Sequence, residues 1–414
     1  MLKIAVHTLG CKVNQCDADA LVSALVARGF VAFSTRDFDQ ENADVFVINT
    51  CTVTHVSDKK SRQMVRRARR FNPNAVIAVC GCMVKSSSMQ IEGADFVFDA
   101  RKPEDLFEHI KSLAGINVCP TAVTTKIRTR SFIKIQDGCD RFCAYCIVPH
   151  VRGEVKSRPP HEILAEAENL VANGAPEIVI TGIQLAAYGQ DIKSVSLPAL
   201  IEKIAAIHGR LRLSSIDPWA VTDDFLAAVE NSRLCDHFHL SLQSGCDKTL
   251  ARMNRRYTTD DYAAASAALK KIRPTAAVTT DIIVGFPGET DADFEKSLNF
   301  VREMAFAQIH VFEYSAREGT PAASFPDQVP VKIKHERGKI MRESAAELQK
   351  NFLHSQVGTT ASVLLGKSSA PGMFKGLSTN YCTVLVQSDD DLTRTIKNVE
   401  ITACRDDFLT GTLK

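Results

Sequence analysis

Apolar positions near the start of the chain alternate between short continuous runs and segments with helical spacing. The runs are typical of buried strands, and the segments between them repeat apolar residues every three or four positions. The predicted strands are 2–8, 44–49 and 75–80, and the predicted helices are 17–28, 58–71 and 103–113. Strands that alternate with helices favour a parallel, doubly wound sheet. We therefore expect an α/β domain over residues 1–115.

The same alternation resumes after a polar connection at 116–130. Six further βα units predict an open, incomplete (β/α)6 barrel at 126–356, in which active sites lie at the carboxyl ends of the strands. Its strands are expected at 131–136, 177–181, 210–215, 236–241, 277–284 and 307–312, and its helices at 160–173, 197–207, 222–231, 258–272, 290–304 and 332–355. The tail at 357–414 changes to short β-type runs between turns, which predicts a small β-barrel.

Composition points to metal chemistry rather than to a strongly charged partner. The 414 residues carry a net charge of only +2, so the overall field does not indicate nucleic acid. No apolar run is long enough to span a bilayer, and the first residues do not resemble a signal peptide. We therefore expect a cytoplasmic protein with no membrane partner. Disulfides are rare in that compartment, so thirteen cysteines favour metal binding or reactivity.

Three cysteines stand close together in the run "IQDGCDRFCAYCIVPHVRG". They are Cys139, Cys143 and Cys146, spaced C-x3-C-x2-C, and we call them the loop trio. They follow a predicted strand end, and thiolates at short spacings of this kind hold iron–sulfur clusters. Three ligands leave one iron of a four-iron, four-sulfur cluster open to a substrate or cofactor. A structural zinc site, with His150 as the nearby fourth ligand, is the alternative.

A second set of cysteines is dispersed in the sequence. Cys11, Cys51 and Cys82, the strand-end trio, each follow a predicted parallel strand. Loops at the carboxyl ends of such strands converge on one crevice, so these thiols can meet and hold a second cluster. The alternative is three small buried residues at strand ends. Cys16 and Cys80 are rival ligands by proximity, although we expect Cys80 to point into the packed face of its strand.

Together these motifs resemble the radical S-adenosylmethionine (SAM) methylthiotransferases. The loop trio is similar to the signature loop of radical SAM enzymes, and the strand-end trio lies in "TLGCKVNQ", "VINTCTVT" and "VCGCMV". The segments "SRPPHEIL", "HLSLQSGCDKTLARMNRRYT" and "TDIIVGFPGET" extend the resemblance over nearly the whole chain. The motifs "GCKVNQ", "NTCTVT" and "KSRQMVRRA" look most like the branch that adds a methylthio group to C2 of N6-threonylcarbamoyladenosine at position 37 of tRNA. Sister branches act on isopentenyladenosine in tRNA or on an aspartate of a ribosomal protein.

This resemblance implies cofactors, partners and residue roles. The loop trio would bind the four-iron, four-sulfur cluster used to cleave SAM, and the strand-end trio would bind an auxiliary cluster of the same type as the sulfur source. The partners would be tRNA and an electron-donating reductase, and the C-terminal barrel would bind RNA. Radical chemistry fits such a reaction, because the C2–H bond of adenine is strong and not acidic.

Residues at the ends of predicted barrel strands are candidates for SAM contacts. Thr181 and Gly182 end one strand, Ser241 and Gln243 follow another, and Gly285 follows a third. Glycine lets the backbone approach a ligand closely, although a glycine at a strand end is more often a simple turn. The two glycines and a glutamate that are usual in radical SAM enzymes are missing, so the group that binds the SAM amine is not assigned.

Two segments carry enough positive charge to contact RNA. The run "KKSRQMVRRARR" at 59–70 has seven basic residues and no acidic one, and Arg66, Arg67 and Arg70 are its candidate RNA-binding residues. A solvated helix face is the alternative reading of this run. Residues 126–158 carry eight basic and three acidic residues, whereas six of each cancel in the tail at 357–414. A zinc-stabilised RNA-binding protein without catalysis is the alternative from another functional class.

Overall fold

The computed structural model describes residues 2–35, 43–86, 91–114, 129–207, 209–368 and 370–414. Most of the predicted connection at 116–130, including Cys119, lies outside the described residues. No helix within them is both long and apolar enough to cross a membrane. The chain forms two compact units. Unit 1 comprises Met1–Lys126, Asp137–Glu154 and Ser315–Thr320, and unit 2 comprises Ile127–Gln136, Val155–Tyr314 and Pro321–Lys414.

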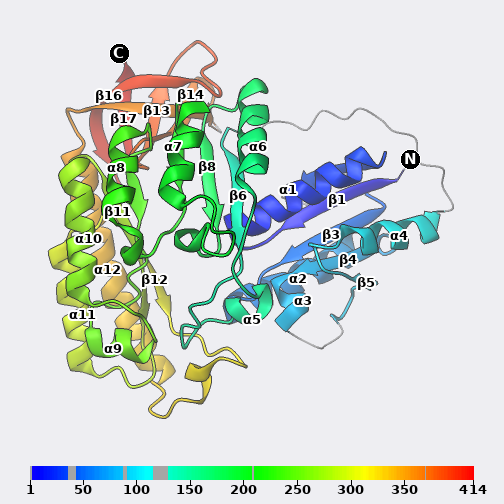
Figure 1. Ribbon diagram of the computed structural model, residues 1–414, viewed down its shortest axis with the longest axis horizontal. Helices are drawn as coiled ribbons and strands as arrows, with labels where there is room; N and C mark the ends of the chain where they lie inside the picture. The colour runs from blue at the N-terminus through cyan, green and yellow to red at the C-terminus, as the bar shows by residue number, and fades with distance from the viewer. Residues whose placement is uncertain (1, 36–42, 87–90, 115–128, 208, 369) are drawn as a thin grey trace. The chain divides into compact units, whose positions relative to one another are not determined.

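A parallel sheet forms the centre of unit 1, as predicted (Figure 1). Its strand order is β2-β1-β3-β4-β5, with β1 at Lys3–Thr8, β2 at Val31–Thr35, β3 at Val45–Thr50, β4 at Val76–Gly81 and β5 at Phe96–Val97. Helices α1 (Lys12–Ala27) and α4 (Pro103–Ala114) cover one face, and α2 (His55–Phe71) and α3 (Cys82–Ser86) cover the other. Because side chains alternate along a strand, Val45 and Val47 pack on the first pair of helices and Phe46 and Ile48 on the second. The doubly wound prediction is confirmed.

The predicted start of α1 is wrong. This helix begins at Lys12 rather than at residue 17. The sequence patterns also failed to predict strands β2 and β5 and helix α3. The usual signals of a helix start are missing at α1, because its first turn has no acidic residue and the Cys11 side chain makes no capping hydrogen bond. As a result, Cys11 stands at the N-terminus of α1 and not in an open loop.

Two segments distant in sequence complete unit 1. The loop after β6 leads into α5 (Val148–Arg152), and Ile147 and Val151 pack against Cys82. The loop trio therefore belongs to the same packed unit as the strand-end trio. The segment Ser315–Thr320 joins through Arg317, whose Nη2 donates to Asp58 Oδ2 at 2.6 Å.

The open barrel predicted from the sequence is present in unit 2. Its six parallel strands are β6 (Ser131–Asp137), β8 (Ile178–Gly182), β9 (Leu211–Leu213), β10 (His237–His239), β11 (Ala277–Val284) and β12 (Gln308–Glu313). They form one sheet of order β7-β6-β8-β9, with β7 at Lys156–Ser157, and a second of order β10-β11-β12. A parallel bridge between Ile216 and Leu240 connects the two sheets.

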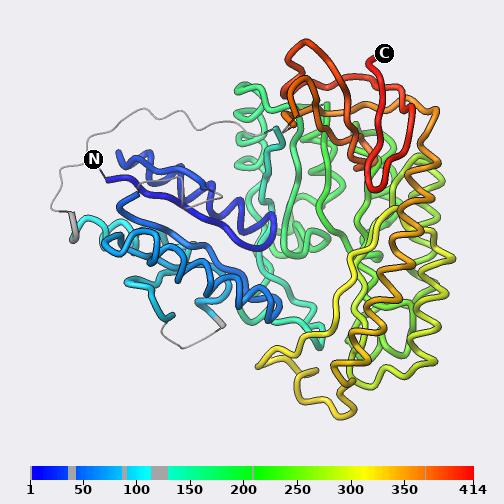
Figure 2. The backbone as a smooth tube through the Cα atoms, turned by 180° about the vertical axis from the view of Figure 1, so that it is seen from behind, coloured from blue at the N-terminus to red at the C-terminus, as the bar shows by residue number. Residues whose placement is uncertain are grey.

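Helices cover one side of these strands. They are α6 (Pro160–Ala172), α7 (Leu197–Ile207), α8 (Asp223–Asn231), α9 (Asp247–Arg252), α10 (Thr259–Ile272), α11 (Asp291–Met304) and α12 (Val331–Ser355). Val278 and Ile282 of β11 share a core with Tyr262 of α10 and Leu298 of α11. The long helix α12 runs beside β12, as Figure 2 shows in orange and yellow.

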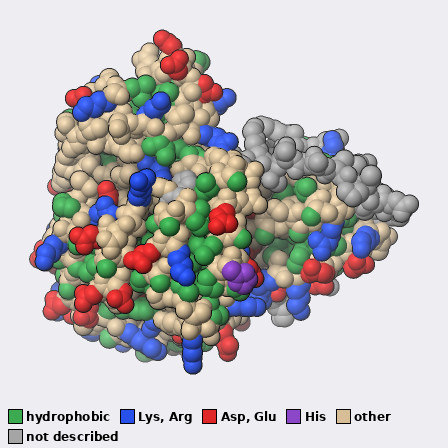
Figure 3. Space-filling model, turned by 45° about the horizontal axis from the view of Figure 1, so that its top comes forward, with side chains coloured by type: hydrophobic (Ala, Val, Ile, Leu, Met, Phe, Trp, Pro, Cys, Tyr) green, Lys and Arg blue, Asp and Glu red, His purple; other side chains and the backbone are tan. Residues whose placement is uncertain are grey.

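The tail forms the small β-barrel that its short runs predict. Strands β13 (Thr360–Lys367), β14 (Met373–Ser378), β15 (Thr383–Gln387), β16 (Ile396–Arg405) and β17 (Phe408–Leu413) close in the order β13-β14-β15-β17-β16. Basic and acidic side chains are interspersed on the face shown in Figure 3. The tail carries equal numbers of basic and acidic residues, so its formal charges cancel.

A buried ion-pair network joins this small barrel to the rest of unit 2. Glu177 accepts from Arg210 Nε at 2.8 Å and from Arg212 Nε at 3.0 Å. The same two arginines donate to the carbonyl oxygens of Leu377 (2.9 Å) and Ser378 (3.0 Å). Burial would raise the pKa of Glu177, but the two guanidinium groups outweigh it and hold that pKa below its ordinary value.

Candidate metal centres

The strand-end trio gathers at the carboxyl ends of three neighbouring strands of unit 1. Cys11 follows β1, Cys51 follows β3, and Cys82 follows β4 as the first residue of α3. The approach is close, because a Cβ atom placed on Gly10 would lie only 3.0 Å from Cys51 Sγ. The thiols are also near enough for the charges of Cys11 and Cys51 to influence the pKa of Cys82. The structure thus brings the three predicted residues together.

Asn14 ties the three cysteine-bearing loops to one another. Its Nδ2 donates to the carbonyl oxygens of Leu9 at 2.8 Å and Thr50 at 2.9 Å, which lie shortly before Cys11 and Cys51 in the chain. Its Oδ1 accepts from the thiol of Cys82 at 3.8 Å. Asn14 is fully buried, so these bonds are shielded from water and fix the spacing of the loops.

A buried cation stands beside the strand-end trio. Arg152, at the end of α5, is only 8% exposed. Its guanidinium donates to Asn14 Oδ1, to Asp17 Oδ2 at 2.8 Å and to Asp137 Oδ2 at 3.1 Å. Buried charges are retained only where partners compensate them. A thiolate-ligated cluster adds negative charge, and Arg152 supplies positive charge next to the place where that charge would lie.

The charge of Arg152 also acts on the thiols themselves. Burial raises the pKa of Cys82 to about 11, and Arg152 opposes this rise. Desolvation likewise raises the pKa of Cys11. Thiols bind metals only after losing their protons, so the guanidinium favours loading of the site. Three convergent thiols beside a buried cation fit an iron–sulfur cluster.

The two rival cysteines occupy different surroundings. Cys80 is fully buried in the core between the sheet and helices α1 and α4, and burial raises its pKa. Its orientation into the packed face of β4 is therefore confirmed. Cys16 lies half-buried within α1. Neither residue directly follows a strand, as the members of the trio do.

The loop trio lies in a turn held by backbone hydrogen bonds. The Cys139 amide donates to the Gly153 carbonyl at 3.0 Å, and the Cys146 amide donates to the Cys143 carbonyl at 2.9 Å. Cys143 is buried, whereas the other two cysteines are half-buried. A compact loop with partly open thiols fits a cluster that must also admit a small molecule.

His150, the predicted fourth ligand of the zinc alternative, has another neighbour. It is exposed, and its ring packs edge-on against Phe142 with the ring centroids 5.7 Å apart.

Among the described residues, neither the loop trio nor the strand-end trio belongs to a group of ligand atoms that all lie within 4.8 Å of one another.

The predicted SAM residues lie at the carboxyl ends of β8, β10 and β11 in unit 2. Gln243 has a left-handed backbone (φ 74°), and its amide donates to the Asp281 carbonyl at 2.9 Å. The amide of Gly285 donates to Glu289 Oε1 at 2.9 Å. SAM contact stays a prediction for the set of Thr181, Gly182, Ser241, Gln243 and Gly285.

The basic residues chosen for RNA contact lie along α2. Arg66 and Arg70 are exposed, and Arg67 is half-buried. Arg66 forms an ion pair with Glu92 at 2.9 Å, in which both side chains are largely exposed to water. Such pairs are weak, so this one can give way to a phosphate group. The RNA role of these arginines stays a prediction.

Sequence reasoning missed Asn14 and Arg152. Asn14 follows Cys11 by three residues, and Arg152 lies in the basic segment after the loop trio. The sequence shows only that each of these polar residues lies close to a candidate cysteine ligand. Their burial and their hydrogen-bond partners depend on the fold.

Comparisons with known proteins identify this fold. A model of the radical SAM superfamily matches residues 133–301, and a model described as Uncharacterized protein family UPF0004 matches residues 3–100. The solved structure of the radical S-adenosylmethionine methyltransferase TsrM from Kitasatospora setae superposes with a TM-score of 0.58 at 14% identity, covering 91% of this chain and 81% of that one. The matched family model and the fold therefore define a radical SAM protein.

Relatives of similar length narrow the assignment. A threonylcarbamoyladenosine tRNA methylthiotransferase MtaB of Bacillus subtilis is 38% identical, covering 97% of this chain and 94% of the relative. A tRNA-2-methylthio-N(6)-dimethylallyladenosine synthase of Pelotomaculum thermopropionicum is 34% identical, covering 100% of this chain and 98% of the relative. The chain belongs to the radical SAM methylthiotransferase family, whose cofactors include SAM and an iron–sulfur cluster.

Proposed function

We propose that this protein is a tRNA methylthiotransferase with two four-iron, four-sulfur clusters, one on each cysteine trio. The observation that carries the proposal is the convergence of Cys11, Cys51 and Cys82 beside the buried cation of Arg152. A radical SAM enzyme needs only the loop trio to cleave SAM, so a second set of thiols in the same packed unit indicates a second inorganic group.

The residues of the chain have distinct tasks in this proposal. When bound, the clusters and SAM supply the electron, the radical and the sulfur for the reaction. The loop trio would hold one cluster through its three thiolates, and that cluster would bind SAM. Asn14 keeps the strand-end loops at a fixed spacing, and Arg152 balances the charge of their thiolates. The residues at the ends of β8, β10 and β11 would orient SAM.

For the substrate, we propose N6-threonylcarbamoyladenosine at position 37 of tRNA. Relatives whose names carry this nucleoside are 38%, 35% and 37% identical to the chain. Relatives named for dimethylallyladenosine are 34%, 33% and 32% identical. The difference is small but consistent, and it agrees with the motifs around the strand-end trio. Arg66, Arg67 and Arg70 would contact tRNA phosphates, and a reductase would deliver electrons.

Nucleoside mass spectrometry tests the substrate assignment. We expect tRNA from a deletion strain to lose methylthio-threonylcarbamoyladenosine and to accumulate threonylcarbamoyladenosine without the methylthio group. Wild-type protein should restore the modification, whereas a Cys143→Ala variant should not. Loss of the methylthio group from isopentenyladenosine, or from a ribosomal protein analysed in parallel, would assign the chain to a sister branch. Unchanged modification of all three in a strain lacking related genes would end the proposal.

A further inference from the structure

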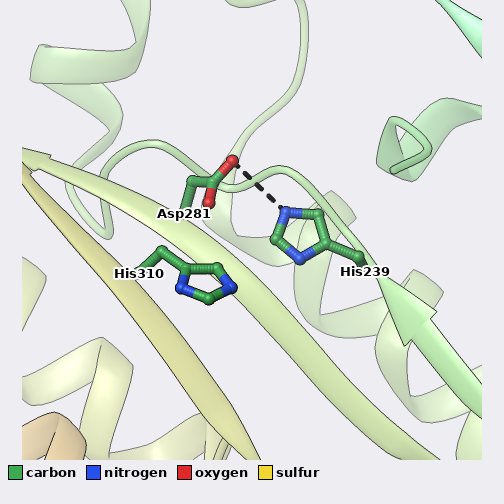
Figure 4. Close-up of side chains that lie close together, drawn as sticks. All are labelled: His239, Asp281 and His310. Atoms are coloured by element: carbon green, nitrogen blue, oxygen red, sulfur yellow. Dashed lines mark ion pairs between the residues drawn. The ribbon is translucent and has the colours of Figure 1, made fainter. Parts of the chain in front are cut away.

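Unit 2 contains a cluster of ligand-type side chains that the proposed function does not use. His239 of β10, Asp281 of β11 and His310 of β12 come from three neighbouring strands and point toward one another (Figure 4). Their ligand atoms all lie within 4.8 Å of one another. Within the described part of the chain, three or more histidine, cysteine or carboxylate side chains meet at this spacing in this group.

The register of the parallel strands explains how these residues meet. It places Thr279 opposite His239 and Asp281 opposite His310. The alternate residues of β11 pack in the helix-covered core, so Asp281 projects from the opposite face of the sheet. The side chains of His239 and Asp281 are 11% and 28% exposed, and His310 is exposed. A small ion can therefore reach the group from its open side.

The orientation of His239 suits a metal ligand. Its Nε2 lies 3.3 Å from Asp281 Oδ2, and its ring centroid lies 5.9 Å from that of His310. Its other ring nitrogen, Nδ1, lies 3.0 Å from Thr279 Oγ1. Histidines that bind metals nearly always have such a partner at the second nitrogen, which fixes the ring and directs the first nitrogen at the ion. Thr279 thus has the position of a supporting residue.

We propose that His239, Asp281 and His310 bind one divalent transition-metal ion through two imidazole nitrogens and one carboxylate oxygen. Zn²⁺, Fe²⁺ and Mn²⁺ all accept this donor set. Three protein ligands leave coordination positions for water or for an oxygen atom of a bound molecule. The site contains no sulfur donor, so its metal preference differs from that of either cysteine trio.

The rival explanation is an ordinary histidine–carboxylate ion pair, and the chain offers a second example with the same distance between its atoms but a more exposed histidine. His335 Nδ1 lies 3.3 Å from Glu313 Oε1, the same distance as in the His239–Asp281 pair. This second pair does not belong to a three-ligand group among the described residues. A His335→Gln variant therefore removes a histidine–carboxylate ion pair without removing a proposed ligand.

Binding of Mn²⁺ to the anaerobically prepared holoprotein tests the site. Mn²⁺ prefers oxygen and nitrogen to thiolates, so it discriminates against the cysteines, and the free ion is measured by electron paramagnetic resonance. We expect one Mn²⁺ per wild-type chain, with nitrogen couplings from histidine in the pulsed spectrum. Asp281→Asn and His310→Gln should each weaken binding at least about tenfold, and Thr279→Val about tenfold or more. His335→Gln should bind like the wild type.

Two results would overturn the proposal. One is the absence of saturable Mn²⁺ binding to the wild-type protein, and the other is equal affinity in the wild type, Asp281→Asn and His310→Gln. Thermal unfolding of each variant identifies any loss of fold. His310 is exposed, so His310→Gln keeps the fold and decides the question if Asp281→Asn does not. The measurement needs no tRNA, so its outcome is independent of the proposed substrate.

Discussion

Gly10 approaches Cys51 so closely that one added methyl group should disrupt the strand-end trio. It has a left-handed backbone (φ +94°), and a Cβ atom there would lie 2.8 Å from Cys51 Cβ and 3.1 Å from Asn14 Nδ2. Both neighbours belong to the arrangement that spaces the thiols. A Gly10→Ala substitution must therefore move either a proposed ligand or the amide that positions it.

Gly93 provides the matched control for this substitution. Its backbone is also left-handed (φ +87°), but a Cβ atom there would meet Val65 Cγ1 at 3.5 Å, which is ordinary contact. Alanine in a left-handed conformation costs about 1–2 kcal/mol at either position. At Gly10 the new methyl also lies about 0.6 Å inside ordinary contact with Cys51, and such overpacking adds about 1–3 kcal/mol. We expect destabilisation of about 2–5 kcal/mol for Gly10→Ala and about 1–2 kcal/mol for Gly93→Ala.

Iron analysis after anaerobic reconstitution, together with denaturant unfolding, measures both effects. Wild type and Gly93→Ala should each hold about eight iron atoms per chain, the content of two four-iron clusters. Gly10→Ala should hold about four, because the loop trio does not depend on Gly10. Full iron content in Gly10→Ala, with stability equal to that of Gly93→Ala, would refute the close approach on which this reasoning rests. Equal loss from both clusters would refute a local effect.

Three other predictions follow from charges in the structure. Arg152→Met removes the guanidinium that pairs with the largely covered carboxylates of Asp17 and Asp137, so stability should fall by about 3–5 kcal/mol and auxiliary iron should be lost. Wild-type iron content in this variant would contradict the charge account. Glu177→Gln leaves two buried guanidinium groups without their balancing charge, so the denaturation midpoint at pH 7 should fall below that of the wild type. Because the pKa of Glu177 is depressed in the folded state, this loss of stability should shrink as the pH drops below 4.5. A loss of stability that does not change with pH would contradict the ion-pair account. Replacing Arg66, Arg67 and Arg70 together by alanine should weaken tRNA binding. The slope of log affinity against log salt concentration should become less steep by about one unit for each phosphate that is no longer neutralised. Unchanged binding at all salt concentrations would remove α2 from the interface.

Most strands and helices could be predicted because their hydrophobic period is strong. The central strands of the sheet in unit 1 and of the open barrel in unit 2 are buried on at least one face and appear in the sequence as apolar runs, so β11 was located to the residue. The short edge elements gave no comparable signal: β5 has only two residues, and β2 is half-exposed. The start of α1 was misplaced because Cys11 takes a position normally held by a capping residue.

The candidate sites differ in how far local sequence reveals them. The loop trio is visible because its ligands are seven residues apart at most, whereas the strand-end trio needs the additional step of aligning strand ends in a sheet. Asn14 and Arg152 could not be found that way, since their importance comes from burial and from partners on other loops. The group of His239, Asp281 and His310 depends on the exact register of three strands, which sequence periodicity does not supply.

Iron content of two cysteine variants tests the two-cluster claim most directly. Replacement of the strand-end trio by alanine, and separately of the loop trio, should each lower the iron content from about eight to about four atoms per chain. Mössbauer spectra should show that the two variants retain different clusters. A strand-end variant that keeps all the iron of the wild type, or a wild type that holds zinc in place of iron, would contradict the account.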